Sequence, residues 1–290
     1  MLKRIALAGL LLLLLGAGVI VGTLVYQGKK KPSANAYYVA LGSSFASGPG
    51  LGKRVAGSPM ICQRTVNSYP QQLARLLNAP SFTDMSCGGA TLGHVLNGGQ
   101  MFQGPQVDAL GPGTELVTLT GGGNDVAYVG DLLMMAAANG EGVQSWVAKR
   151  LWKEPKRWTD RDFDGVARRM EAIARQVSQR SPRARIVFVT YPALLPESGA
   201  CPALGLTAAQ AEIMRPVARK LAQVTIDAAR RSNGVLVDMA ALSRGHDVCS
   251  KAPWVNGAHP VQGAGFHPNV AGMKATANAI KTELERAKRN

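Results

Sequence analysis

The chain has 290 residues, which fits one α/β domain of about 250 residues behind a leader, and 46% of it is hydrophobic, enough to bury a sizeable core. Its 33 Lys and Arg residues against 18 Asp and Glu give a net charge of +15, which favours anionic lipid surfaces or acidic polymers as partners. No nucleic-acid-binding motif occurs, so nucleic acid is not expected as a partner.

The N-terminus carries an apolar run from Ile5 to Tyr26. A run of about 20 apolar residues is long enough to span a bilayer, whereas the apolar part of a secretory signal is usually shorter. We therefore expect a single membrane anchor and an extracytoplasmic folded part. The alternative is a signal peptide cleaved near Ala36, at an A-x-A-like site, and a secreted protein. In both cases residues 1–36 form a leader with its linker, and residues 37–290 form the folded domain.

Five short runs in the folded part, rich in apolar, aromatic or β-branched residues, predict strands over residues 37–41, 81–85, 115–120, 185–191 and 235–239. Helices are predicted over residues 69–77, 90–96, 160–179, 206–232 and 269–289. Pro216 should kink the fourth of these helices or break it. Because strands alternate with helices, we expect a mostly parallel sheet between helices.

The segment from Asp131 to Trp158 combines an apolar half with a half rich in Trp and basic residues. Trp together with Lys and Arg suits a membrane interface. However, Trp146 and Trp152 do not share a helical face, so the sequence gives no clean amphipathic helix. We favour a solvated helical insertion near the functional site.

The four cysteines of the chain form no C-x-x-C pair, which argues against a zinc ribbon or a thioredoxin-like redox motif. They are Cys62, Cys87, Cys201 and Cys249. An even number behind an export segment predicts disulfides, and three pairings are possible. Since no metal-binding or dinucleotide fingerprint occurs either, neither a metal nor a cofactor is expected.

Four short blocks carry the residue types that a serine nucleophile needs. They are Gly42-Ser43-Ser44, Cys87-Gly88-Gly89, Gly122-Gly123-Asn124-Asp125 and Phe266-His267-Pro268-Asn269. The first and third follow predicted strands, and in open α/β sheets that end of a strand is where ligands bind. A serine hydroxyl requires a base to take its proton, and attack on an ester requires donors for the oxyanion. The blocks contain candidates for both.

In this order and spacing the blocks resemble the SGNH, or GDSL-like, hydrolase family, from about Tyr37 to the last helix. The resemblance implies a flavodoxin-like three-layer α/β/α fold with a mostly parallel sheet, and an esterase or lipase activity. Ser44 matches the family's nucleophile, although Ser43 replaces the usual Asp of its G-D-S pattern. The N–H groups of Ser44 and Gly89 and the amide of Asn124 match the family's oxyanion hole.

The resemblance also favours the disulfides Cys62–Cys87 and Cys201–Cys249, which would brace loops around the site.

His267 matches the family's base, because it alone among the histidines lies in a Phe-His-Pro-Asn context followed by a helix. Many family members carry an Asp three residues earlier, where this chain has Ala264. We therefore predict a Ser-His dyad in which the main-chain carbonyl of Ala264 orients the imidazole. The acids that compete with this prediction are Asp125, Asp238 and Asp247.

These patterns predict an exported, monomeric serine ester hydrolase that acts on an ester or lipid substrate. An acyltransferase or polysaccharide O-deacetylase on the same fold is the alternative. The missing acid and Ser43 also leave open a catalytically silent envelope binding module. An α/β-hydrolase is disfavoured, because its G-x-S-x-G serine follows several strands, whereas this serine follows the first strand and Ala46 replaces the last glycine.

Overall fold

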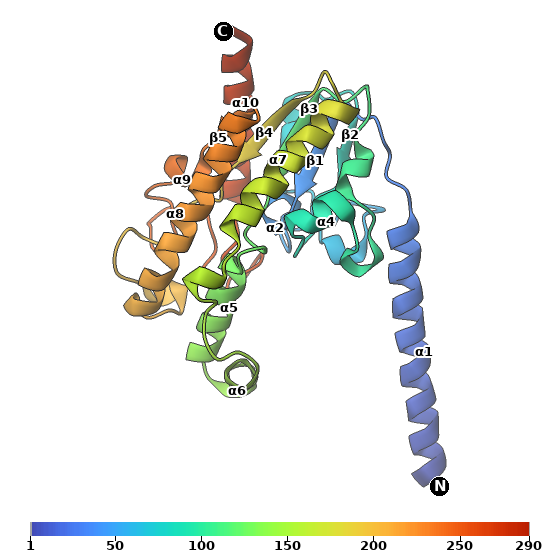
Figure 1. The fold of residues 1–290 in the computed structure, drawn as a ribbon. Helices are drawn as coiled ribbons and strands as arrows, with labels where there is room; N and C mark the ends of the chain where they lie inside the picture. The colour runs from blue at the N-terminus through green and yellow to red at the C-terminus, as the bar shows by residue number, and fades with distance from the viewer. Residues whose placement is uncertain (1, 290) are drawn as a thin grey trace.

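The computed structural model describes residues 2–289, and within them all side chains except those of residues 2–12 and 288. Helix α1 (Leu2–Lys29) extends away from the folded body and leads into the first strand (Figure 1). Across the residues that the structure describes, no helix combines the length and apolarity needed to cross a membrane. The anchor expected over Ile5–Tyr26 therefore finds no support, and the side chains of its residues 5–12 lie outside those described.

A parallel five-stranded sheet forms the centre of the body, in the order β2-β1-β3-β4-β5. The strands are β1 (Tyr38–Gly42), β2 (Phe82–Asp84), β3 (Leu116–Thr120), β4 (Arg185–Val189) and β5 (Val235–Val237). Every residue of β1 and β3 is buried, as is usual for central strands of a sheet covered on both faces. The predicted parallel sheet is thus confirmed.

Helices cover both faces of the sheet, which gives three layers (Figure 1). Alternate residues of β1 point to opposite faces: Val39 and Leu41 pack in one core cluster, Tyr38 and Ala40 in the other. The first cluster includes residues of α4 (Leu92–Asn97), α5 (Tyr128–Asn139), α7 (Phe163–Arg180) and α8 (Ala208–Arg231). The second includes residues of α3 (Tyr69–Leu76) and α10 (Val270–Arg289). The short helices α2 (Ser44–Ser47) and α9 (Met239–Leu242) follow β1 and β5.

The fourth predicted helix forms without a break at its proline. Helix α8 runs from Ala208 to Arg231 with Pro216 inside it. The neighbouring side chains of Met214 and Val217 are buried in the core, so packing holds this stretch although the proline donates no backbone hydrogen bond.

The segment with the three tryptophans forms two helices, α5 and α6 (Gly142–Leu151), and a short 3₁₀ turn over Trp158–Asp160. The helical insertion predicted there is present. Helix α5 points away from the sheet, and α6 lies at its far end (Figure 1). The pair therefore projects from the body on the same side as α1.

Candidate active site

Strand β1 ends in a tight turn that places Ser43 and Ser44 at the carboxyl edge of the sheet. Gly42 has a φ of +133°, and a Cβ atom there would collide with the carbonyl oxygen of Thr120, so only glycine fits. The Ser43 N–H donates to that same oxygen at 2.9 Å. Ser44 is the first residue of α2, and its N–H has no hydrogen-bond partner among the described residues. That N–H is therefore free to bind a ligand.

The His267 side chain reaches Ser44 from the loop before α10. Its Nε2 atom lies 2.7 Å from the Ser44 Oγ, and both side chains are buried. The preceding residue, Phe266, has a φ of 54°, a left-handed conformation that is uncommon for a bulky residue. The His267 carbonyl accepts the Asn256 N–H at 2.8 Å. The centroid of the imidazole ring lies 4.9 Å from that of the Phe45 ring. The structure thus brings together the predicted nucleophile and the predicted base.

The other ring nitrogen of His267 contacts a main-chain carbonyl, although not the predicted one. Nδ1 lies 2.6 Å from the oxygen of Gly265. The Ala264 oxygen instead accepts a hydrogen bond from the Asn256 side chain at 3.2 Å. The prediction of Ala264 was wrong by one residue, because the left-handed turn at Phe266 brings the ring over the nearer carbonyl.

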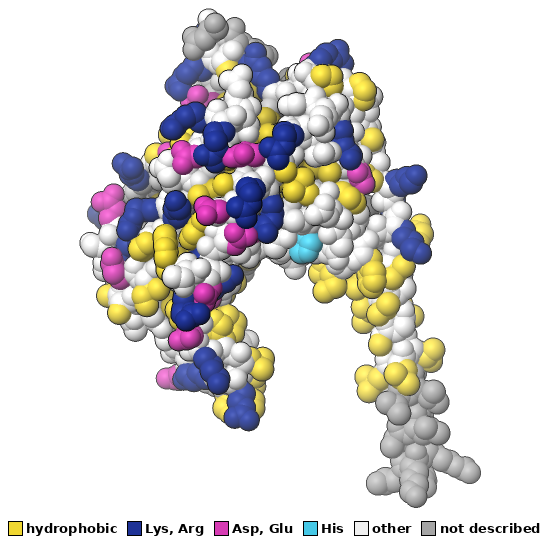
Figure 2. All heavy atoms as spheres, in the orientation of Figure 1, with side chains coloured by type: hydrophobic (Ala, Val, Ile, Leu, Met, Phe, Trp, Pro, Cys, Tyr) yellow, Lys and Arg dark blue, Asp and Glu magenta, His cyan; other side chains and the backbone are white. Residues whose placement is uncertain are grey.

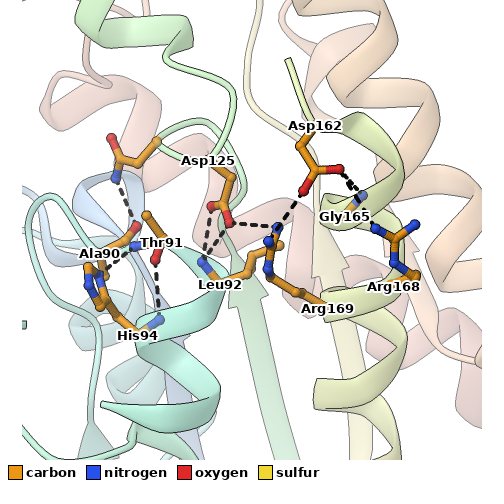
Figure 3. Close-up of polar contacts among 10 residues, drawn as sticks. Ala90, Thr91, Leu92, His94, Asp125, Asp162, Gly165, Arg168 and Arg169 are labelled. Carbon is orange, nitrogen blue, oxygen red and sulfur yellow. Dashed lines mark hydrogen bonds and ion pairs between the residues drawn. The ribbon is translucent and has the colours of Figure 1, made fainter. Parts of the chain in front are cut away.

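The three competing aspartates have other partners. Asp125 accepts the Leu92 N–H at 3.0 Å and lies 3.5 Å from the Arg169 guanidinium, which joins its loop to α4 and α7 (Figure 3). Asp238 caps α9 through the Ala241 N–H at 3.2 Å and accepts a hydroxyl hydrogen bond from Thr190.

Asp247 accepts the N–H of Cys249 at 2.8 Å. None of the three hydrogen-bonds His267, and no carboxylate among the described residues forms an ion pair with a histidine. The hydrogen-bonding surroundings of His267 therefore contain no acid.

Burial lowers the pKa of His267 below its ordinary value of 6.5, and the hydrogen bond to Gly265 opposes this effect only in part. The imidazole is therefore neutral at pH 7. With its proton on Nδ1, facing the carbonyl, Nε2 is left as an acceptor for the Ser44 hydroxyl proton.

The loop of Gly89 is fixed to the end of β1. The Cys87 N–H donates to the Gly42 oxygen at 3.0 Å, and Cys87 forms a disulfide with Cys62. Gly89 has a φ of +77°, and its N–H has no hydrogen-bond partner in the part of the chain that the structure describes. The Gly89 N–H is therefore a second free donor.

The Asn124 side chain connects the second and third blocks. Its Nδ2 donates to the carbonyl oxygen of Ala90, the residue after Gly89, at 2.8 Å. An amide nitrogen carries two hydrogens, so one remains for another acceptor. The two blocks predicted to supply oxyanion donors therefore contact each other.

The second predicted disulfide, Cys201–Cys249, is also present. It braces the turn that contains Ala203, whose carbonyl accepts the Ala258 N–H at 2.9 Å. Ala258 belongs to the loop that leads to His267. Both disulfides thus stabilise segments that carry the candidate site.

Residues 40–275 match the family model described as GDSL-like Lipase/Acylhydrolase. The chain belongs to this family. Lipase 2 of Streptomyces coelicolor is 31% identical over 251 residues, 83% of each chain, and lipase 1 of that organism is 26% identical over 273 residues, 93% of this chain and 95% of its own. The chain is accordingly a carboxylic ester hydrolase of the lipase and esterase type.

Two solved structures have the same fold. The phospholipase A1 of Streptomyces albidoflavus is 28% identical, with a TM-score of 0.67 over 86% of this chain and 99% of its own. The extracellular lipase of Streptomyces rimosus is 26% identical, with a TM-score of 0.68 over 85% and 98%. These matches agree with a three-layer hydrolase fold over nearly all of the body.

In this member of the GDSL-like family Ser43 precedes the candidate nucleophile. One hydrogen-bond partner of Ser43 is Tyr191, which the sequence did not indicate. The Ser43 Oγ lies 3.1 Å from the Tyr191 hydroxyl oxygen, which also accepts the Gly123 N–H at 3.2 Å. Burial raises the pKa of Tyr191 to about 12, so the phenol stays protonated. Tyr191 thereby links the serine turn to the turn that carries Asn124. The only feature of the sequence that could have indicated a role for Tyr191 is its position at the end of the strand predicted over residues 185–191.

Proposed function

We propose that Ser44 is the nucleophile and His267 the general base and acid of a two-step ester hydrolysis. The single observation that carries the proposal is the 2.7 Å contact between the Ser44 Oγ and Nε2 of a buried, neutral imidazole. In the first step Oγ attacks the ester carbonyl while Nε2 takes its proton, and the alcohol then leaves with that proton. In the second step Nε2 of His267 takes a proton from water as the water oxygen attacks the acyl carbon. The bond between that carbon and the Ser44 Oγ then breaks, Oγ takes the proton back from Nε2, and the carboxylic acid is released.

The oxyanion of each tetrahedral intermediate is proposed to bind the N–H groups of Ser44 and Gly89 and the second Nδ2 hydrogen of Asn124. The two N–H groups have no partner among the described residues, and both belong to turns held by the backbone of the sheet edge. Donors fixed in this way need little reorganisation during the reaction, which is why such sites stabilise developing charge well.

We propose a lipid ester as substrate and a location outside the cytoplasm. Similar proteins are lipases and a phospholipase A1, and one of them is described as extracellular. Two disulfides, with no free cysteine among the described residues, fit an oxidising compartment. One chain supplies every proposed catalytic group, so a monomer is sufficient.

The assignment is tested with a fluorophosphonate probe, which reacts with activated serines, and with turnover of a short p-nitrophenyl ester. The wild-type protein should be labelled on Ser44. Ser44→Ala should lose both labelling and turnover, whereas Ser43→Ala, the matched control one residue away, should still be labelled on Ser44. Labelling that survives Ser44→Ala, or that maps to Ser43, would refute the assignment.

A further inference from the structure

Helix α6 exposes an apolar face at the far end of the α5–α6 projection. Val143, Trp146, Val147 and Leu151 are 77%, 66%, 38% and 79% exposed. Their spacing of three, four and eight residues from Val143 places them on one side of the helix. Within α6 only Ser145 and Ala148 are buried, so these large apolar side chains are exposed on a helix that buries only small residues.

The opposite side of α6 packs against α5. Ser145 and Ala148 are buried, and the Ser145 hydroxyl donates to the Ala138 carbonyl at 3.1 Å. Just after the helix, Trp152 also turns inward, with its indole N–H 3.4 Å from the Asp131 carboxylate. These contacts hold α6 in place without any contribution from its apolar face. That face packs against no other part of the described chain.

Basic side chains lie on this face and next to it: Arg150, seven residues after Val143, falls on the face itself, and Lys153 and Lys156 follow the end of the helix. The basic side chains are Lys149, Arg150, Lys153 and Lys156, and none of them forms an ion pair with a described residue. The acids of the same stretch are only Glu141 and Glu154. Figure 2 shows basic and hydrophobic side chains next to each other on this projection.

We propose that α6 docks on the surface of an anionic lipid bilayer. Trp146, Val143 and Leu151 would enter the boundary between headgroups and acyl chains, and the four cations would contact headgroup phosphates. Helices with one apolar face and flanking Lys and Arg bind bilayers in this orientation, and unpaired cations near the surface add to the binding. The excess of positive charge favours this occupant over a second copy of the same basic chain.

Helix α5 connects the docking surface to the candidate active site. It begins at Tyr128, four residues after Asn124, and its Leu133 side chain lies against Gly265, whose carbonyl contacts the His267 ring. Docking through α6 would therefore hold the site in one orientation relative to the bilayer. The docking itself does not depend on the catalytic roles proposed above.

The test uses the full chain and vesicles of phosphatidylcholine with or without an equal part of phosphatidylglycerol, made with brominated acyl chains that quench inserted tryptophans. Helix α1 also exposes apolar side chains, so total binding is uninformative and the signal must come from α6. The difference between wild type and Trp146→Phe isolates the fluorescence of Trp146. We expect quenching of Trp146 on the anionic vesicles and much less on vesicles of phosphatidylcholine alone.

A paired variant tests the consequence for lipid turnover. Trp146→Ser/Leu151→Ser should lower hydrolysis of vesicle lipid about tenfold and leave a soluble short-chain ester unaffected. Ile213→Ser/Leu242→Ser is the matched control, because those side chains are similarly exposed, at 52% and 53%, on α8 and α9. It should behave as wild type in both assays.

The proposal would be overturned if Trp146 were not quenched, or if its quenching were the same with and without phosphatidylglycerol. It would also be overturned if Ile213→Ser/Leu242→Ser lost as much vesicle-lipid hydrolysis as Trp146→Ser/Leu151→Ser. So would a dimer that the Trp146→Ser/Leu151→Ser variant dissociates. If no ester is hydrolysed at all, the proposed catalytic function fails, while quenching still decides the docking.

Discussion

The Nδ1 atom of His267 lies 2.6 Å from the backbone carbonyl oxygen of Gly265. A carbonyl accepts the Nδ1 proton and so fixes the tautomer and the orientation in which Nε2 faces Ser44. In a Ser-His-Asp triad a carboxylate does this and also stabilises the imidazolium. A neutral carbonyl stabilises the cation less, which makes the proposed site a dyad.

The dyad predicts that no single aspartate is required for turnover. Asp125→Asn, Asp238→Asn and Asp247→Asn should each keep kcat within about tenfold of wild type, whereas disabling the acid of a true triad costs about 10⁴. His267→Ala should abolish activity. Turnover of a short ester, with folding checked by circular dichroism, measures this. One folded Asn variant as inactive as His267→Ala would reveal a hidden acid.

The pH dependence of kcat/KM should reflect the buried imidazole. Because burial lowers the pKa of His267, the ring takes up its inactivating proton only below its ordinary value of 6.5. Activity should therefore persist at pH 6.5 and fall on the acid side of it. A pH profile of kcat/KM, measured within the range where circular dichroism shows the protein folded, gives the pKa of the group whose protonation abolishes activity. A half-maximum above pH 6.5 would contradict a depressed pKa.

Truncation of the proposed side-chain oxyanion donor should slow the reaction more than it weakens substrate binding. Asn124→Ala should lower kcat by roughly 10² to 10³, the effect of losing one such donor. Steady-state kinetics gives kcat and KM separately. A variant with near-normal kcat would remove Asn124 from the mechanism.

Tyr191 is predicted to act through the turn of Asn124 rather than on the substrate. Tyr191→Phe leaves the buried Gly123 N–H without its acceptor, which costs about 1 to 3 kcal/mol, and should lower kcat about tenfold. In a double-mutant cycle, Tyr191→Phe should have little further effect once Asn124 is Ala. Fully additive losses would show that the two residues act independently.

The two disulfides should differ in their effect on activity more than in their effect on stability. They close loops of 25 and 48 residues, and loss of either should lower the free energy of unfolding by roughly 3 to 4 kcal/mol. Cys87 lies two residues from Gly89, a proposed oxyanion donor, whereas Cys201–Cys249 acts on the loop of His267 only through the hydrogen bond from Ala258 to Ala203. Cys62→Ser/Cys87→Ser should therefore lower kcat more than Cys201→Ser/Cys249→Ser, under conditions where both variants are folded. Urea unfolding and steady-state kinetics make the comparison. Equal kcat in the two variants would contradict it.

The regular parts of this fold were predictable because each strand carries its own signal. The apolar run before Gly42 and the run before Gly121 identified β1 and β3, and both lie where expected. The pairing of Ser44 with His267 followed from the family resemblance and not from spacing, since 223 residues separate them.

The missed features depend on backbone conformation or on distant partners. The carbonyl of Gly265, rather than that of Ala264, meets the imidazole because Phe266 is left-handed, which no local pattern indicates. Tyr191 finds Ser43 across the sheet. The apolar face of α6 does not follow from the tryptophans, because Trp146 and Trp152 lie on different sides of the chain, whereas Val143, three residues before Trp146, is exposed beside it.

The separation of Ser44 and His267 along the chain has a consequence for refolding. Ser44 follows the first strand of the sheet, whereas His267 lies just before the last helix, α10, so their contact closes a loop of 223 residues. Closing so long a loop is entropically costly until the elements between its ends have assembled. Recovery of turnover after dilution from denaturant should therefore lag behind recovery of helical circular dichroism, and it reports when the chain has completed its native topology.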